Sequence, residues 1–281
     1  MAIYLKHSAN VKPWRWGGDT DIRYAVQENA GRIYGINPDN IVLAMPMFPH
    51  APLLDYSKFG NDGTNYGATW AGQSLSFDGV NDYVNVGTSI NMASWSALSA
   101  GAWVKYDSSG TDEHTIISSF DGTGTKATIL LRLEPADDTV EAFMLMEANT
   151  QIGGSFLDLV LTPNKLHFVL ITYDKTNGLQ AFLDGVKSAT SYSSAAGLDA
   201  TASPVMWIGN TLHTPADMFT GLIDNVHISN TILTANQAAL MYDRPWGLYE
   251  PVQRPVYFFL GAVGGISIPV IMHHRKQIGV S

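Results

Sequence analysis

Cysteine is absent from all 281 residues, which excludes a disulfide framework, a thiolate metal site and a thiol nucleophile. Charged residues are scarce, at 15% of the chain against about 25% in an average protein. Long apolar runs are missing as well: the stretch Tyr257–Met272 is interrupted by three glycines and Pro269, and is too short and broken for a membrane-spanning helix. The first residues, MAIYLKHSANVKPWRW, lack the apolar segment and cleavage site of a secretory signal. We therefore expect neither a membrane anchor nor secretion.

Positive charge is lacking from the middle of the chain. The net charge is −9 overall, but residues 44–243 carry −13, whereas residues 1–43 carry +1 and residues 244–281 carry +3. An acidic body repels phosphate, so we expect no binding to nucleic acid.

Catalytic motifs are also missing. The chain has no G-x-S-x-G turn, no H-E-x-x-H and no E-x-D-x-E run. Glu141 and Glu147 are separated by about 20 Å if they lie on one strand, which is too far for a retaining glycosidase pair. The pair His273–His274 is a poor chelate, because adjacent strand residues face opposite sides. We therefore predict no catalytic residues and a protein that is not an enzyme, although carboxylates paired across strands remain an alternative.

What the chain does contain is a repeated unit of short strand and polar turn. In Leu75–Val86, LSFDGVNDYVNV, two alternating stretches flank Asp78-Gly79-Val80-Asn81-Asp82, which has the composition of a tight turn. Similar units recur every 8–15 residues from Val42 onward, and the clearest hairpin spans Lys165–Lys187. This pattern predicts an all-β fold, an antiparallel two-sheet jelly-roll sandwich.

Helical signals are confined to one place. Thr234 and Gln237 have the spacing of a capping box and open a short helix before Pro245. We predict three regions: an extended N-terminal arm (1–43), a jelly-roll domain (44–243) and an extended C-terminal tail (244–281). For the N-terminal arm two interpretations stay open, ordering against a partner or packing on its own domain.

The order of several short motifs resembles the laminin-G-like, pentraxin-related branch of the concanavalin A-like lectin/glucanase superfamily. The matching stretches are NDGT at 61–64, LSFDGVNDYVNV at 75–86, GAWVK at 101–105, HFVLITYD at 167–174, LQAFLDGV at 179–186, WIGN at 207–210, FTGLIDNVHIS at 219–229 and LTANQAALMYD at 233–243. The resemblance implies a sandwich core, which we expect the rings of Phe77, Tyr83, Trp103 and Trp207 to fill.

The resemblance also implies ligands. Related jelly rolls bind calcium through turn oxygens, and candidate donors here are Asp78, Asn81, Asp82, Asp224 and Asn225. The alternative is that Asp78 and Asp82 only form the turn and that Asp224 bonds to nearby backbone. Carbohydrate is the usual ligand of the family, and Tyr66, Trp70, Trp95 and Tyr192 are candidate rim aromatics.

The tail adds a second resemblance. Its Pro-punctuated start, RPWGLYEP, and its apolar end are similar to tails of laminin-G-like structural proteins of tailed bacteriophages. We therefore expect a virion protein, a capsid decoration or head/tail appendage subunit made in the host cytoplasm. Its expected partners are other virion proteins, further copies of itself in a homo-oligomer, and glycans. The alternatives are a carbohydrate-binding lectin module of a secreted bacterial protein and a glycoside hydrolase.

Overall fold

Two antiparallel sheets face each other across the main hydrophobic core. The computed structural model describes residues 19–49, 52–72, 74–92, 95–108, 112–120, 127–146, 150–194, 196–198, 205–211, 217–252, 256–258 and 270–272. The eight-stranded sheet consists of β13 (Val186–Tyr192), β12 (Gly178–Leu183), β11 (His167–Asp174), β6 (Ala97–Tyr106), β15 (Thr220–Ser229), β4 (Ser74–Asp78) and β3 (Thr69–Ala71), in that order, with β1 (Ile41–Met45) on β15. The seven-stranded sheet has the order β10 (Thr150–Val160), β9 (Thr139–Met146), β8 (Ala127–Glu134), β7 (His114–Phe120), β14 (Val205–Ile208), β5 (Tyr83–Gly87) and β2 (Thr64–Tyr66). The predicted two-sheet antiparallel sandwich is confirmed.

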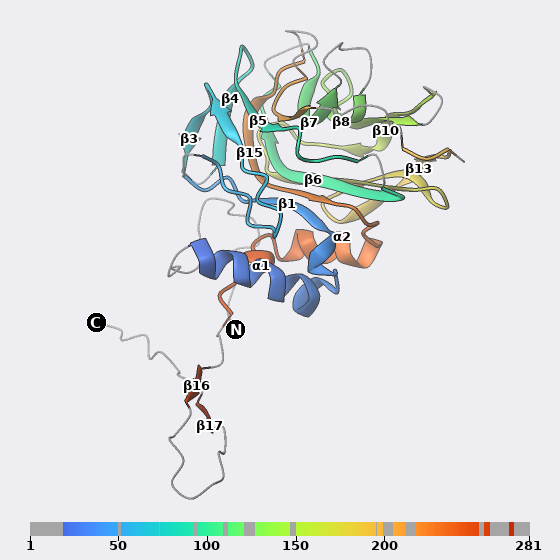
Figure 1. Ribbon diagram of the computed structural model, residues 1–281. Coiled ribbons are helices and arrows are strands. Elements are labelled where there is room, and N and C mark those ends of the chain that lie inside the picture. The colour runs from blue at the N-terminus through green and yellow to red at the C-terminus, as the bar shows by residue number, and fades with distance from the viewer. Residues whose placement is uncertain are drawn as a thin grey trace, which may run out of the picture.

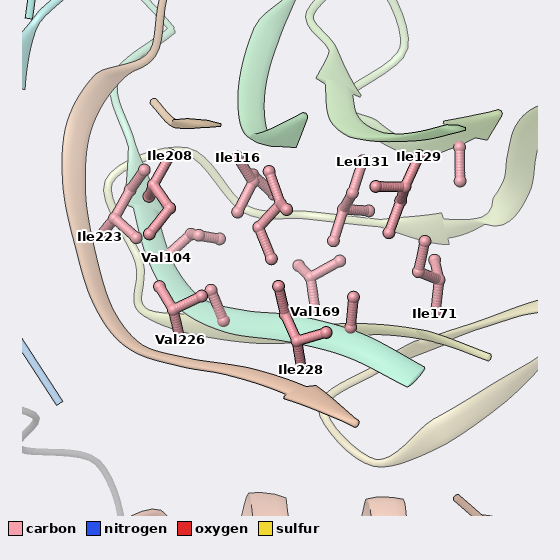
Figure 2. Packing of buried hydrophobic residues seen from close by; sticks show 14 of the residues in the cluster. Val104, Ile116, Ile129, Leu131, Val169, Ile171, Ile208, Ile223, Val226 and Ile228 are labelled. Atoms are coloured by element: carbon pink, nitrogen blue, oxygen red, sulfur yellow. The ribbon is translucent and has the colours of Figure 1, made fainter. Parts of the chain in front are cut away.

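The core forms from the alternate side chains of each strand, because successive residues point to opposite faces. In Figure 2, Val104, Val226 and Ile228 of the eight-stranded sheet point toward Ile116 and Leu131 of the seven-stranded sheet. All five side chains are fully buried. This apolar layer holds the two sheets together and leaves each with one outer face.

Helices cover the outer face of the eight-stranded sheet. They are α1 (Asp19–Tyr34) and α2 (Ala235–Asp243), with two short 3-10 turns, η1 (Pro38–Asn40) and η3 (Gly247–Tyr249). Figure 1 shows α1 and α2 on the side of β1, β6 and β15 that faces away from the second sheet. Trp103, Phe168 and Phe182 point outward from β6, β11 and β12 and form a second core with these helices. The outer face of the seven-stranded sheet has no helix over it among the described residues.

Helix α1 corrects the prediction that the N-terminal region is an extended arm. Its buried residues Ile22, Val26, Ala30 and Tyr34 follow each other every four positions, and this stripe packs in the second core. The stripe was hidden in the sequence because it also contains the fully buried Asn29 and two alanines, which give little apolar contrast. Of the two interpretations left open for this region, packing on its own domain holds for α1.

Helix α2 confirms the predicted capping box. Thr234 is its N-cap, the Thr234 side chain accepts from the Gln237 amide, and the Gln237 side chain accepts from the Thr234 amide. Each of these bonds satisfies a donor that the first turn of a helix leaves free. None of the described helices has the length and apolarity to cross a membrane.

The predicted aromatic filling of the main core is right for Phe77 and wrong for three other rings. Phe77 is 2% exposed in the core between the sheets. Trp103 lies in the second core and stacks on Tyr242 of α2, with ring centroids 5.6 Å apart. Tyr83 and Trp207 lie on the outer face of the seven-stranded sheet, because their strand neighbours Val84 and Ile208 take the inward positions.

The C-terminal region begins with the turn η3, which packs against α1. Farther along, β16 (Val256–Phe258) and β17 (Val270–Met272) pair with each other, and neither has another partner among the described strands. His273 and His274 lie outside the described residues.

Candidate carbohydrate-binding face

The outer face of the seven-stranded sheet carries one continuous row of side chains. Residues directly opposite each other on antiparallel strands point to the same side of a sheet. Strand pairing places the following residues in one row, from β2 to β10: Thr64, Asn85, Trp207, Ser118, Leu130, Phe143 and Gly153. The row points away from the main core and lies on the sheet that the helices leave open.

The row is closed in its middle and open toward its ends. Trp207 is 8% exposed and Leu130 6%, and the Ser118 hydroxyl donates to the carbonyl of Asn210 at 2.6 Å. Thr64 is exposed at one end and Phe143 is half-buried toward the other. A ligand on this face would therefore contact the β2–β5 end or the β8–β10 end.

At the β2–β5 end two tyrosines form a stacked pair. Tyr66 on β2 lies opposite Tyr83 on β5, with ring centroids 4.6 Å apart and ring planes 14° from parallel. Tyr66 is 44% exposed. Tyr66 and Tyr83, with Thr64 and Asn85 beside them, are called the tyrosine edge below. Aromatic rings that are held flat and exposed offer the apolar, polarisable surface on which the C–H face of a sugar stacks.

Glycine at position 67 holds the tyrosine edge in place. Gly67 follows Tyr66 with φ +85°, and a Cβ on it would lie 2.1 Å from Asp82 Oδ1. The β2–β3 turn thus packs directly against the β4–β5 turn, where Asp82 accepts a hydrogen bond from the Asp78 amide at 2.9 Å. This close approach requires glycine, because any side chain would collide with Asp82.

At the β8–β10 end, Arg132 contacts three carboxylates. Arg132 Nε donates to Glu141 Oε2 at 2.5 Å, and its Nη atoms lie 3.2 Å from Glu113 Oε1 and 3.6 Å from Asp217 Oδ2. Only 16% of the Arg132 side chain is exposed. We call these four residues the arginine cluster.

Two neighbours complete the arginine cluster. The Arg132 guanidinium lies 5.6 Å from the centroid of the Phe143 ring, within the range of a cation–π contact. The Ser155 hydroxyl on β10 donates to Glu141 Oε1 at 3.2 Å. Burial, with the Glu141 charge nearby, raises the pKa of Tyr192, whose hydroxyl donates to the Ser155 carbonyl. The cluster is thus held together by three ion pairs, one cation–π contact and the hydrogen bond from Ser155.

The structure separates the predicted calcium donors. Asp78 Oδ1 accepts from the amides of Val80 at 2.8 Å and Asn81 at 3.4 Å, which is the geometry of a turn. Asp224 lies on β15, where it accepts from the Ser74 hydroxyl and from the Asn225 amide. Asp78 and Asp82 are thus neighbours, whereas Asp224 lies beside Ser74, at the opposite end of β4 from Asp78.

Asn225, the last of the predicted donors, belongs to the helical layer. Its side-chain amide donates to the Pro245 carbonyl, and its Oδ1 accepts from the Tyr249 hydroxyl at 3.1 Å. Within the described ranges, no three His, Asp or Glu side chains are grouped as they would be to hold a metal ion. The calcium assignment stays a prediction.

The predicted rim aromatics divide into two classes. Tyr66 and Trp70 are exposed, at 44% and 39%. Trp95 and Tyr192 pack against the main core instead. Of the two carboxylates weighed as a pair, Glu141 belongs to the arginine cluster, and Glu147 lies outside the described residues.

A family model described as the concanavalin A-like lectin/glucanases superfamily, Laminin_G_3, matches residues 78–239, more than half of the sequence. The chain belongs to the concanavalin A-like lectin/glucanases superfamily. The predicted superfamily is thereby confirmed, while the resemblance of the tail to bacteriophage proteins stays a prediction. No curated protein sequence matches the chain.

Solved structures that resemble this chain in fold include a sialidase and receptor-binding domains of botulinum neurotoxins. Trypanosoma rangeli sialidase in complex with sialic acid superposes with a TM-score of 0.61 at 13% identity, covering 82% of this chain and 39% of the sialidase. The receptor-binding domain of botulinum neurotoxin D gives a TM-score of 0.58 at 14% identity, covering 74% and 53% of the two chains. The receptor-binding domain of the C/D mosaic serotype gives 0.56 at 15% identity, covering 73% and 51%. The chain thus spans about two fifths of the sialidase, and at these identities the likeness shows the fold.

These structures overturn the prediction that the protein is not an enzyme, because sialidases are among the proteins that contain this fold. The prediction rested on motifs within single strands. The arginine cluster shows the weakness of that argument: Glu141 and Glu113 meet at Arg132 from different parts of the chain.

The sequence predicted neither the stacking of Tyr66 on Tyr83 nor the arginine cluster. Tyr83 and Asn85 alternate with the buried Val84 and Val86, which marks one face of β5, but not its partner strand. Arg132 is the single base in the apolar run ATILLRLE, and this was the available signal for a buried ion pair.

Proposed function

We propose that this superfamily member is a carbohydrate-binding protein and that it binds sugar on the outer face of the seven-stranded sheet, at the tyrosine edge. The observation that carries the proposal is the stacked Tyr66–Tyr83 pair, with Tyr66 44% exposed, on the face that the helices leave open. Apolar side chains that lie side by side on a surface mark interaction sites, whereas singly exposed ones are common. Structural likeness to a sialidase that holds sialic acid and to toxin receptor-binding domains supports the proposal.

A glycan array followed by calorimetric titration of the best ligand tests this proposal. Tyr66→Ala removes the exposed ring, and we expect it to weaken binding at least tenfold while the melting temperature stays within a few degrees. Phe59→Ala is the matched control, because Phe59 is also exposed, at 49%, but lies in the loop beside Lys58, which pairs with Asp39 next to the helices. Equal loss in both variants, or no bound glycan, contradicts the proposal.

We further propose that the protein is a structural subunit of a tailed bacteriophage, a capsid decoration or head/tail appendage that self-associates and resides in the virion. The observation that favours this role is the β16–β17 pair, which joins neither sheet of the sandwich. An isolated two-stranded hairpin is only marginally stable in water, so an apolar hairpin of this kind is suited to pairing with a neighbouring subunit.

Light scattering coupled to gel filtration tests the self-association, and mass spectrometry of purified particles tests the virion role. We expect the full chain to form an oligomer and a chain ending at Val252 to be a monomer with an unchanged melting temperature. A full chain that stays monomeric, or particles that lack it, contradicts this proposal.

A further inference from the structure

The edge of the sandwich where β10 and β13 meet carries three exposed apolar side chains. β10 is the end strand of the seven-stranded sheet, and β13 is the end strand of the eight-stranded sheet. Leu157 and Val160 on β10 and Val186 at the start of β13 are each more than half exposed. We call these three residues the edge patch. Apolar side chains that lie side by side on a surface mark interaction sites.

Hydrogen bonds between β10 and β13 show how the two strands run past each other. The Tyr192 hydroxyl donates to the Ser155 carbonyl at 2.9 Å, and the Ser188 hydroxyl donates to Asp158 Oδ1 at 2.5 Å. A step forward along β10 thus corresponds to a step backward along β13. The two strands are therefore antiparallel where the sheets meet.

This antiparallel course brings the members of the edge patch together. Val160 follows Asp158 by two positions and Val186 precedes Ser188 by two, so the two valines come beside each other. Residues two apart on a strand point to the same side, so Val186 faces β10 as Ser188 does. Leu157, next to Asp158, extends the patch along β10.

The surroundings of the edge patch are acidic. Asp158 lies between its two residues on β10, and hydrogen bonds from β13 lower the pKa of the Asp158 carboxyl. The β8–β9 turn adds Asp137 and Asp138, because the Leu161 amide donates to the Asp138 carbonyl at 2.7 Å. Lys187 on β13 offsets one of these charges. The edge patch therefore favours a partner that is apolar and positively charged.

The C-terminal strands of this chain have that chemistry. β16 has the sequence VYF and β17 has the sequence VIM. Residues 253–281 contain three bases, Arg254, Arg275 and Lys276, and no acid. Neither strand pairs with a strand of the two described sheets, and Figure 1 shows both beyond the helical layer, away from β10 and β13. A second copy of the chain therefore has to supply the strands for the edge patch of the first.

We infer that the β16–β17 pair of one subunit docks on the edge patch of the next subunit, so that the subunits associate head to tail. This inference rests on the proposed self-association and names the two surfaces that make it. Apolar contact supplies the affinity, and the opposite charges of the tail and the edge steer the encounter. Because each subunit donates at one place and receives at another, the contact is heterologous and builds a ring or an open chain.

A lysine placed in the edge patch tests the contact. Val186→Lys puts a charge where the apolar strands dock, and we expect association to weaken about tenfold or more, because that charge would lose its water. Val80→Lys is the matched control: Val80 is an equally exposed valine, in the β4–β5 turn. Light scattering coupled to gel filtration over a range of concentrations measures the association, and both variants should keep the wild-type melting temperature within a few degrees.

The outcomes separate this inference from the proposal on which it rests. An unchanged oligomer of Val186→Lys, or an equal loss in Val80→Lys, overturns the docking on the edge patch. A wild-type chain that stays monomeric overturns the proposed self-association itself. Val160→Lys repeats the test should Val186→Lys not fold.

A mixing experiment distinguishes head-to-tail from symmetric association. A chain ending at Val252 keeps the edge patch, both sheets of the sandwich and both helices, but lacks β16 and β17. Val186→Lys keeps these strands and has the altered patch. We expect each protein alone to be a monomer and the mixture to form a complex with one copy of each. A dimer of the shortened chain alone, an oligomer of Val186→Lys alone, or a mixture without a complex overturns the inference.

Discussion

Asn29 of α1 donates from one side-chain amide to two carbonyls at the far end of the chain, Leu248 at 3.1 Å and Glu250 at 2.8 Å. Arg32, one turn later, donates to Asn29 Oδ1. The first helix and the segment that follows the last helix are therefore fastened together over the eight-stranded sheet. This link joins the helical layer over one face of the sandwich, while the opposite face has no helix over it among the described residues.

Replacing Asn29 tests this link. Asn29→Ala removes a fully buried donor and leaves the two carbonyls unsatisfied, which costs about 1–3 kcal/mol. We expect urea unfolding to show a loss in the free energy of unfolding of that size. Gln27→Ala, on the exposed side of the same helix, is the control and should change stability little. A similar loss in both variants would contradict the role of the link, because alanine raises the helix propensity at both positions.

Asp55 organises the segment between β1 and β2, and its removal should be costly. Its carboxylate is fully buried and accepts from the amides of Ala44, Ser57 and Asn61 and from the Ser57 hydroxyl. Burial raises the pKa of Asp55, and these four bonds oppose that shift. Asp55→Ala leaves these buried donors without an acceptor, so we expect chemical unfolding to show a free energy of unfolding lower by about 3 kcal/mol. Asp39→Ala, at an exposed surface pair with Lys58, should change stability by less than about 1 kcal/mol.

The sandwich was predictable because its signals are local. The alternation of apolar and polar residues within a strand, and the turn residues that follow it, both lie within about ten residues of sequence. Leu75 and Phe77 before the Asp78–Asp82 turn are an example. Helix α1 escaped prediction because its packing uses Asn29, a polar residue that is buried through partners more than 200 positions away. The residues around Asn29 in the sequence do not indicate partners at such a distance along the chain.

The candidate site was less predictable, for a related reason. Stacking of Tyr66 on Tyr83 requires the register between β2 and β5, and the arginine cluster requires Glu113 and Asp217 to come together from positions over 100 residues apart. The residue types were visible, but their distances are a property of the folded sheets. Trp207 illustrates the same point: its burial was predictable and its side of the sheet was not.

His227 should make the fold sensitive to acid. The ring is 1% exposed on β15, neither ring nitrogen has a partner among the described residues, and burial lowers its pKa to about 4. The unfolded chain binds the proton near pH 6.5, so the folded state loses stability as the pH falls from there toward 4. We expect the loss between pH 7 and pH 5 to be about 2 kcal/mol from this group.

A variant isolates that contribution. His227→Leu removes the titrating ring, so the difference in unfolding free energy between wild type and variant should shift by about 2 kcal/mol between pH 7 and pH 5. His114, whose pKa burial also lowers, is present in both proteins and cancels. A difference that stays constant with pH would contradict the assignment to His227.

The Asp78–Asp82 turn should be independent of calcium. Asp78 Oδ1 and Asp82 Oδ2 already accept backbone hydrogen bonds, and Asp224 is engaged elsewhere, by Ser74 and Asn225. We expect the melting temperature in 5 mM calcium and in EDTA to agree within about 1 °C, far less than the rise that ligand linkage gives to a protein with a tight site. A rise with calcium that Asp82→Asn abolishes would instead assign the metal to this turn.

Gly67 should control both the fold of the tyrosine edge and its binding. A Cβ at this position meets Asp82 Oδ1 at 2.1 Å, and the φ of +85° is unfavourable for any other residue. Gly67→Ala therefore forces the β2–β3 turn away from the β4–β5 turn, at a cost of about 1–3 kcal/mol. Because Tyr66 precedes this turn directly, we expect the variant to lose glycan affinity beyond what its stability explains. Gly35→Ala is the matched control: Gly35 also has a positive φ, +64°, with open space around its missing Cβ, and it follows α1 in the helical layer. It should cost stability through strain while leaving glycan affinity unchanged. Equal affinities of Gly67→Ala and Gly35→Ala for the bound glycan would mean that the turn does not position Tyr66.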